Sequence, residues 1–252
     1  MKAMILAAGL GTRLRPLTND RPKALVEVNG RTLLEITLAR LRDFGIRDVI
    51  VNVHHFADLV VEHLRANNNF GINIEVSRED DQLLDTGGGL KKAAEFFLRD
   101  GSDEAFILHN VDVLSSIDLA EMVRQHRERS ALATLAVQQR DSSRQLLFER
   151  DGQLCGRCNG HDASPEMVRK CSHAEQSAFC GIHVISTRIF SLMNETGVFP
   201  IIPVYLRLAS AGEKIYGFPA DKYYWRDLGT AASLERAAED SSNGAVALGP
   251  AE

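Results

Sequence analysis

The fold is indicated by the stretch MILAAGLGTRLRPLT at residues 4–18, which is followed by RPK at residues 21–23. Its apolar start, residues 3–6, is typical of a buried parallel strand. The loop after it contains Gly9 and Gly11 and little side-chain bulk, so its backbone N–H groups can approach an anionic ligand closely. Arg13 adds a planar, bidentate cation and Lys23 adds a point charge. This combination predicts a site that holds a polyphosphate.

The loop also suits two other interpretations. Gly9 and Gly11 also suit a plain strand-to-helix turn without a ligand. A dinucleotide-binding loop fits less well, because Leu14 stands where G-x-G-x-x-G needs its third glycine.

Composition limits the function classes. The chain has 252 residues, of which 44% are hydrophobic and 25% charged, as in an ordinary globular protein. This length need not hold more than one α/β domain. A net charge of −5 argues against a general nucleic-acid or anionic-membrane binder. No run reaches the roughly 20 apolar residues of a membrane span. Residues 1–8 lead directly into the loop and do not suit a removable signal, so a cytoplasmic protein is expected.

Apolar patterns alternate between strand and helix along the chain. Strands are predicted at residues 48–53, 72–76, 105–108, 131–137 and 179–185, and helices at 33–44, 57–65, 90–98, 119–129, 188–193 and 203–211. This alternation predicts a mostly parallel sheet with helices on both faces. Ligands of such sheets bind beyond the carboxyl ends of the strands, where residues 7–13 and 110–112 would face one crevice.

The second half of the chain is less regular. Residues 141–180 suit an inserted sheet or flap, and residues 215–218 and 223–225 suit a hairpin. Residues 241–252 offer little apolar surface to bury, which predicts a flexible tail.

The whole opening string resembles the signature L-A-A-G-x-G-T-R-L-x-P-L-T…P-K of the sugar nucleotidyltransferases, and every fixed position is filled. The resemblance implies a three-layer Rossmann-like nucleotidyltransferase fold with a mostly parallel central sheet and a smaller inserted sheet. It also implies one domain over residues 1–240, with a nucleotide-binding half at about 1–135 and a sugar-binding half at 136–240. The implied reaction joins a nucleoside triphosphate to a sugar 1-phosphate and releases pyrophosphate.

The same resemblance implies site residues. Arg13 and Lys23 would be catalytic, and the loop residues Ala8, Gly9, Gly11 and Thr12 would bind the nucleotide. Two acidic positions, Asp112 and Asp227, would hold Mg²⁺, which usually takes one or two carboxylates plus phosphate oxygens. Considered alone, each aspartate suits a turn or a helix cap equally well. Val111 replaces the glycine that usually precedes the first of them.

Base and sugar contacts are also implied. Gly87 and Gly88, in a run of three glycines expected just before a helix, would approach the base. Gln82 would read the base edge, although it stands one place off register. Asn110, Gly181 and Trp225 would contact the sugar. Many relatives carry an E-K-P lysine for the sugar phosphate that is missing here, and Arg157 or Lys170 are candidates to replace it.

Within the family, the short length and residues 51–55 and 84–89 resemble most the N-acetylmuramate-1-phosphate uridylyltransferases. Mannose- and heptose-1-phosphate nucleotidyltransferases are nearly as similar. UTP is therefore the favoured nucleotide, and a monomer or homodimer is expected. A catalytically silent sensor of nucleotide sugars, and an NAD-dependent dehydrogenase, remain as alternatives.

Cysteine and histidine raise a separate metal question. Cys155 and Cys158 have C-x-x-C spacing, but Cys171 and Cys180 do not form the second pair of a zinc knuckle. Reduced thiols without a ligand are the default expectation. His54, His55 and His63 suit loop and helix-surface positions as well as metal ligands.

Overall fold

The computed structural model describes residues 1–101, 104–160 and 164–249. Its centre is a ten-stranded sheet, in which β12 lies between β6 and β8. The strands of the central part, in spatial order, are β5 (Asn73–Arg78), β4 (Asp48–Val53), β1 (Lys2–Leu6), β6 (Phe106–Asn110), β12 (Glu175–Ile185), β8 (Ala133–Gln138) and β13 (Ile215–Pro219). In this part β12 runs against the others, which are parallel. The predicted mostly parallel sheet is confirmed.

Strand β1 lies inside the sheet because its apolar side chains pack on both faces. Ala3, Met4 and Ile5 are fully buried. Met4 is in register with Ile50 on one side and with Leu108 on the other. The register also places Leu6, Asn52 and Asn110 side by side where the three strands end.

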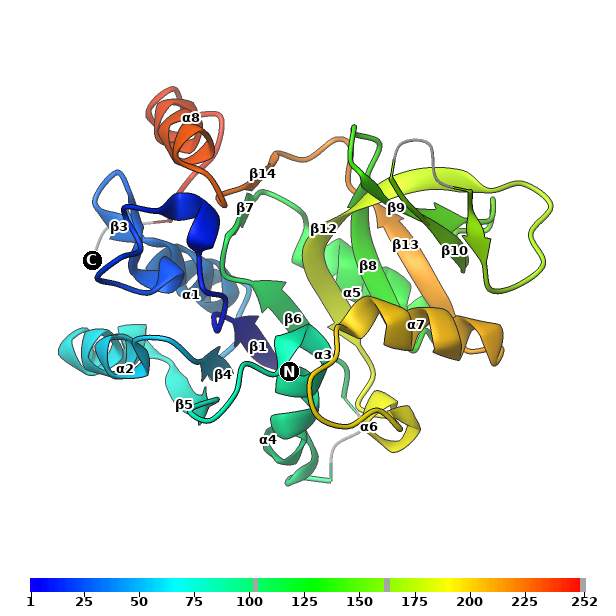
Figure 1. Cartoon of the computed structure of the whole chain (residues 1–252), viewed down its shortest axis with the longest axis horizontal. Helices are drawn as coiled ribbons and strands as arrows, with labels where there is room; N and C mark the ends of the chain where they lie inside the picture. The colour runs from blue at the N-terminus through cyan, green and yellow to red at the C-terminus, as the bar shows by residue number, and fades with distance from the viewer. Residues whose placement is uncertain (102–103, 161–163, 250–252) are drawn as a thin grey trace.

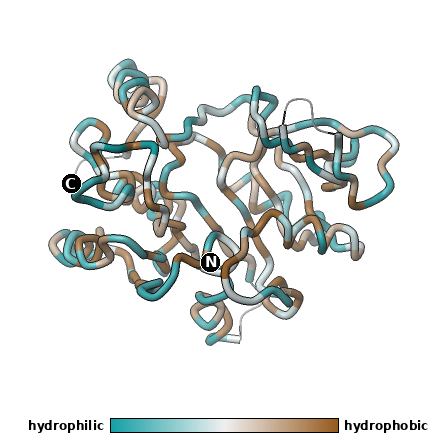
Figure 2. Tube along the Cα trace, viewed as in Figure 1, coloured by the Kyte–Doolittle hydropathy of each residue, from teal (hydrophilic) through white to brown (hydrophobic). Residues whose placement is uncertain are grey.

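Helices cover both faces of the sheet and make three layers (Figure 1). One apolar core lies under α1 (Leu33–Asp43), α2 (Ala57–Ala66), α5 (Leu119–Glu128) and α8 (Ala231–Ser242). The other lies under α3 (Asp85–Lys92), α4 (Ala94–Leu98), α6 (Ile189–Leu192) and α7 (Ile201–Ser210). Hydrophobic residues follow the central strands, and hydrophilic residues gather in the outer loops and on outer helix faces (Figure 2).

A smaller antiparallel part extends the sheet from the first half of β12. It consists of β9 (Arg144–Phe148), β10 (Leu154–Asn159) and β11 (Glu166–Met167). The predicted inserted sheet is therefore present. Residues 161–163, which fall within the predicted flap, lie outside the described residues.

Two local predictions are wrong. The expected hairpin of residues 215–218 and 223–225 does not form, because β13 pairs in parallel with β8 while β14 (Trp225–Asp227) pairs with β7 (Val113–Ser115). The expected single helix over residues 90–98 is two, since the backbone leaves helical geometry at Ala93.

Part of the segment expected to be a flexible tail packs on the body of the protein. Helix α8 extends to Ser242, and Val246 and Leu248 are buried beyond it. Arg31 Nη1 donates to the carbonyl oxygens of Leu248 and Gly249, the latter at 2.7 Å. Residues 250–252 of the predicted tail lie outside the described residues. In the described ranges no helix has the length and apolar character that crossing a membrane requires.

Candidate active site

A crevice of about 460 Å³ opens at the carboxyl ends of β1, β4 and β6. Leu6, Asn52 and Asn110, the three residues in register at that edge, all line it. The other lining residues are Ala7, Ala8, Gly9, Gly11, Thr12, Arg13, Lys23, Leu83, Asp85, Thr86, Val111, Asp112, Val198 and Gly229. The opening string, the 83–86 segment and the end of β6 thus meet in one place, as predicted for an open α/β sheet.

The glycine loop is held open by its own backbone geometry. Gly11 has a φ of 64°, and its carbonyl oxygen accepts a hydrogen bond from Thr18 Oγ1 at 2.8 Å. A Cβ at Gly11 would lie 3.0 Å from Thr18 Cγ2, so both the φ angle and the close approach favour glycine. The loop then enters the short 3₁₀ turn η1 (Thr12–Leu14), which carries Arg13 at the crevice.

Lys23 starts a second 3₁₀ turn, η2 (Lys23–Leu25), directly after Pro22. Its side chain is buried, and its Nζ forms an ion pair with Asp112 Oδ2. Asp112 sits between β6 and β7, and its backbone oxygen accepts a hydrogen bond from Leu228 N at 2.8 Å. A buried ammonium is thus held beside a largely buried carboxylate at the floor of the crevice.

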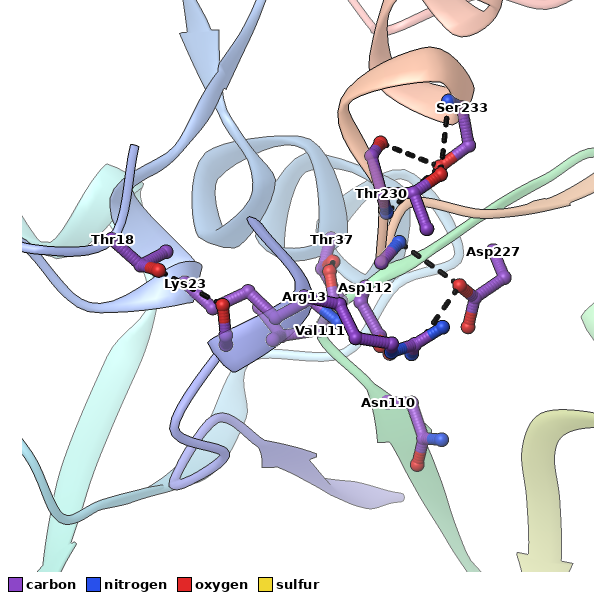
Figure 3. A network of polar contacts seen from close by, with 12 residues as sticks. Arg13, Thr18, Lys23, Thr37, Asn110, Val111, Asp112, Asp227, Thr230 and Ser233 are labelled. Atoms are coloured by element: carbon purple, nitrogen blue, oxygen red, sulfur yellow. Dashed lines mark hydrogen bonds and ion pairs between the residues drawn. The ribbon is translucent and has the colours of Figure 1, made fainter. Parts of the chain in front are cut away.

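Arg13 extends toward Asp227, which lies next to the crevice but is not part of its lining (Figure 3). Arg13 Nη2 lies 3.8 Å from Asp227 Oδ1, which also accepts the Gly229 N–H at 2.9 Å. A Cβ at Gly229 would come within 2.6 Å of the same carboxylate oxygen and would also collide with the guanidinium. Three residues after Asp227, the side chain of Thr230 accepts the Ser233 N–H and caps α8.

The pairing of β14 with β7 brings the two aspartates near each other, since Asp227 is in register with Val113, the residue after Asp112. Asp112 in the lining and Asp227 beside it supply two carboxylates, a donor set that suits Mg²⁺ when phosphate oxygens complete the coordination. In the described ranges no cluster of three or more His, Cys, Asp or Glu side chains could hold a metal unaided. The residues present therefore fit a cation that arrives with a phosphate ligand.

A buried polar chain links the glycine loop to the 79–86 segment. The Ala7 N–H donates to Asn52 Oδ1 at 2.7 Å, and Asn52 Nδ2 donates to Glu79 Oε1 at 2.7 Å. The other Glu79 oxygen accepts the Leu84 N–H at 2.8 Å. Asn52 and Glu79 are almost fully buried. Asn52 was not predicted as a site residue, although its place at the end of a parallel strand is the signal that could have found it.

Not every predicted site residue reaches the crevice. Gln82 is exposed on the loop and does not line it, whereas Leu83, Asp85 and Thr86 do. Gly87 and Gly88 lie inside α3 rather than before it, and their N–H groups donate to the Phe199 carbonyl oxygen. A Cβ at Gly87 would come within 2.5 Å of the Phe199 ring, so this glycine allows close packing of α3 on the segment before α7.

The three predicted sugar contacts form one wall. Asn110 lines the crevice, and Gly181 packs on it, since a Cβ at Gly181 would lie 2.9 Å from Asn110 Nδ2. Trp225 is half-buried beside the residue that precedes Gly181, since its Nε1 donates to the Cys180 carbonyl oxygen at 2.7 Å. Gly181 and Trp225 are therefore placed beyond Asn110 rather than in the lining of the crevice.

The cysteines are free. Cys155 Sγ lies 3.0 Å from Cys171 Sγ, and burial raises the pKa of the Cys155 thiol to about 12, which disfavours the thiolate that a metal needs. His161, which follows the C-x-x-C segment, is outside the described residues.

Comparison with known proteins identifies the class. A family model described as nucleotidyl transferase matches residues 2–148. N-acetylmuramate α-1-phosphate uridylyltransferase of Caulobacter vibrioides is 36% identical over 83% of this chain and 85% of its own length. D-glycero-α-D-manno-heptose 1-phosphate guanylyltransferase of Aneurinibacillus thermoaerophilus is 29% identical over 89% and 91%. The solved inositol-1-phosphate CTP transferase of T. maritima superposes with a TM-score of 0.74 at 19% identity, covering 96% of this chain and 94% of that one.

The chain therefore belongs to the nucleotidyl transferase family, among the sugar-1-phosphate nucleotidyltransferases. The resemblance of its opening string and the expected three-layer fold are both confirmed.

Proposed function

We propose that this enzyme transfers the uridylyl group of UTP to a sugar 1-phosphate, with Mg²⁺ as cofactor. One observation supports it most: two cations of the opening string meet two carboxylates from distant parts of the chain at a glycine-lined crevice, where Arg13, Lys23 and Asp112 are in the lining and Asp227 lies beside Arg13. The preference for UTP rests on the 36% identical uridylyltransferase, whose match covers most of both chains. We also retain from the sequence the proposal of a cytoplasmic monomer or homodimer.

The reaction needs alignment more than proton transfer. An oxygen of the sugar phosphate forms a bond to the α-phosphorus, and the bond from that phosphorus to the bridging oxygen breaks, so pyrophosphate leaves with the electron pair. The attacking oxygen is already anionic and needs no general base. Repulsion between the two phosphates is the main barrier, and fixed cations lower it by positioning and charge stabilisation.

The four charged residues would exchange partners when substrate binds. Lys23 is paired with Asp112 and Arg13 lies near Asp227. Phosphate oxygens compete for both cations: Arg13 would take the departing β- and γ-phosphates, and Lys23 the α-phosphate and the incoming sugar phosphate. Asp112 and Asp227, freed of their cations, would hold Mg²⁺. Bound there, the metal supplies charge neutralisation across the phosphates.

Pyrophosphate release tests the proposal. UTP, GTP, CTP, ATP and dTTP are each combined with N-acetylmuramate, mannose and heptose 1-phosphates, with Mg²⁺ or with a chelator. We expect turnover with UTP and one sugar phosphate, and none in the chelator. Turnover with another nucleotide would reject the UTP preference. Silence across the panel, while UTP still binds, would support the catalytically silent sensor instead.

A further inference from the structure

Arg140 lies at the ligand-binding edge of the sheet, outside the lining of the crevice. It stands two residues after the end of β8, which runs parallel to β6, so both strands end at the same edge. The connection beyond β8 is fixed, since Gln138 Nε2 donates to the carbonyl oxygens of Ala220 and Tyr223 at 2.9 and 3.0 Å. Arg140 is therefore held on the sugar side of the crevice, beyond Asn110.

The guanidinium of Arg140 is clamped between two segments of the predicted sugar wall. Its Cζ lies 4.0 Å from the centre of the Trp225 ring, a stacking arrangement that favours a cation. Its Nη2 donates to the Phe179 carbonyl oxygen at 2.7 Å. Trp225 in turn donates to Cys180, the next residue along β12. The planar group is thus oriented by an aromatic ring and a carbonyl oxygen.

The hydrogen-bonding capacity of Arg140 is not used up. Its Nε is buried without a partner, and in the part of the chain that the structure describes no carboxylate pairs with it. Two other arginines differ: Arg226 pairs with Asp240 at 2.7 Å, and Arg157 on β10 pairs with Glu166 at 2.6 Å. A half-buried guanidinium with spare donors and no counterion is suited to bind an oxyanion.

We propose that Arg140 binds an anionic group of the sugar 1-phosphate. This inference rests on the proposed function, and it answers the absence of the E-K-P lysine. Of the two replacements considered from the sequence, Arg157 is already neutralised by Glu166, and Lys170 is exposed in the smaller sheet region. The anionic group that Arg140 binds is either the 1-phosphate itself or a carboxylate carried by the sugar.

The protein reports on this site directly, because Trp225 is its single tryptophan. A ligand that draws Arg140 from the indole ring changes the tryptophan fluorescence, whether or not catalysis follows. Titrations use two related ligands, N-acetylmuramate 1-phosphate and N-acetylglucosamine 1-phosphate, of which only the first carries a carboxylate. The proteins are the wild type, Arg140→Met and Arg140→Lys. Arg129→Met is the matched control, since Arg129 also stacks on an aromatic ring, Tyr216 at 4.6 Å, but precedes β8 at the opposite edge of the sheet.

We expect saturable fluorescence changes in the wild type and in Arg129→Met. Arg140→Met should weaken binding about tenfold or more, and Arg140→Lys should restore part of it, because lysine keeps the charge but not the bidentate geometry. If Arg140→Met binds both ligands more weakly, the group that Arg140 binds is the 1-phosphate. If it binds only N-acetylmuramate 1-phosphate more weakly, that group is the carboxylate. UTP affinity and melting temperature measured on the same variants exclude misfolding.

Unchanged affinity of Arg140→Met for both ligands, or no titration of the wild type by either, would overturn the inference. Pyrophosphate release measured in parallel separates this result from failure of the proposed function. No turnover, together with Arg140-dependent titration, would reject the function and leave the oxyanion site. Normal turnover with an unchanged KM for the sugar phosphate in Arg140→Met would reject the site and leave the function.

Discussion

At the scale of single residues, the sequence predicts the charged residues of the crevice better than its packing contacts and apolar lining. Arg13, Lys23 and Asp112 line the crevice because each stands at a fixed short distance from a strand end or a proline, which local sequence reveals. Gly87 and Gly88 do not, because their role is set by Phe199, more than a hundred residues away, and no local pattern records that contact. Val198 lines the crevice without any signal in its own segment.

Lys23→Ala should lower kcat/KM by about 10²–10³-fold, the usual loss when one fixed donor to a transition-state oxyanion is removed. The variant also leaves Asp112 without its cation, so some loss of stability is expected beside the kinetic effect. Steady-state kinetics with the best substrate pair, together with a melting curve, measure both. Activity within a factor of about three of the wild type would contradict the role given to Lys23.

Gly181→Ala should destabilise the protein and raise the KM for the sugar phosphate. Gly181 has a φ of 75°, and an added Cβ would lie 2.8 Å from Val113 Cγ2 as well as close to Asn110. We expect a loss of about 1–3 kcal/mol from the forced repacking. Gly212→Ala is the matched control, since Gly212 has a φ of 91° but open space around its Cβ. Equal losses of stability in the two variants would show that backbone strain, not the contact with Asn110, decides the effect.

At the scale of elements, the central strands and the helices that cover them follow from hydrophobic periodicity, but their partners do not. The segments 215–218 and 223–225 each have strand character, yet β13 joins the end of the large sheet and β14 joins β7. Proximity in sequence favours a hairpin, whereas the apolar edge of β8 is the surface that residues 215–219 bury. Tertiary packing decides which strands β13 and β14 pair with, and a local sequence pattern carries no information about it.

Glu79→Ala should weaken nucleotide binding because it breaks the chain of hydrogen bonds between the glycine loop and α3. The change leaves Asn52 Nδ2 and the Leu84 N–H without their buried acceptor, at a cost of about 1–3 kcal/mol for each group. Glu79→Gln keeps one acceptor oxygen, so its UTP affinity should lie between those of the wild type and Glu79→Ala. Calorimetric titration with UTP and thermal melting check this order. Glu75→Gln, four residues earlier on β5 with an exposed side chain, should match the wild type. Equal UTP affinity in all four proteins would rule out the positioning role.

At the scale of the whole molecule, buried histidines make stability depend on pH. Burial lowers the pKa of His109 and of His183 to about 3, and that of His126 to about 4. The unfolded chain binds protons at these side chains below pH 6.5, while the folded protein does not, so stability falls as the pH drops from 6.5 toward 4. Each group contributes up to about 1.4 kcal/mol per pH unit in that window.

Melting temperatures between pH 7.5 and 5 should therefore decline, and His126→Gln should reduce the slope. Glutamine does not titrate there and keeps an acceptor and donor for Thr134 Oγ1, which lies 3.0 Å from His126 Nδ1. His55→Gln, at an exposed position, should leave the slope unchanged. A flat profile in the wild type would contradict the neutral, buried state of these histidines.

The central claim is that the crevice joins a sugar phosphate to the α-phosphorus of a nucleotide, and isotope transfer tests it most directly. N-acetylmuramate 1-phosphate labelled with ¹⁸O in its phosphate is incubated with UTP, Mg²⁺ and the enzyme. The masses of the products are then measured by mass spectrometry. The account predicts that all of the label enters the nucleotide sugar, including its bridging oxygen, and that the pyrophosphate is unlabelled. Label in pyrophosphate, or hydrolysis of UTP without a labelled nucleotide sugar, would contradict it.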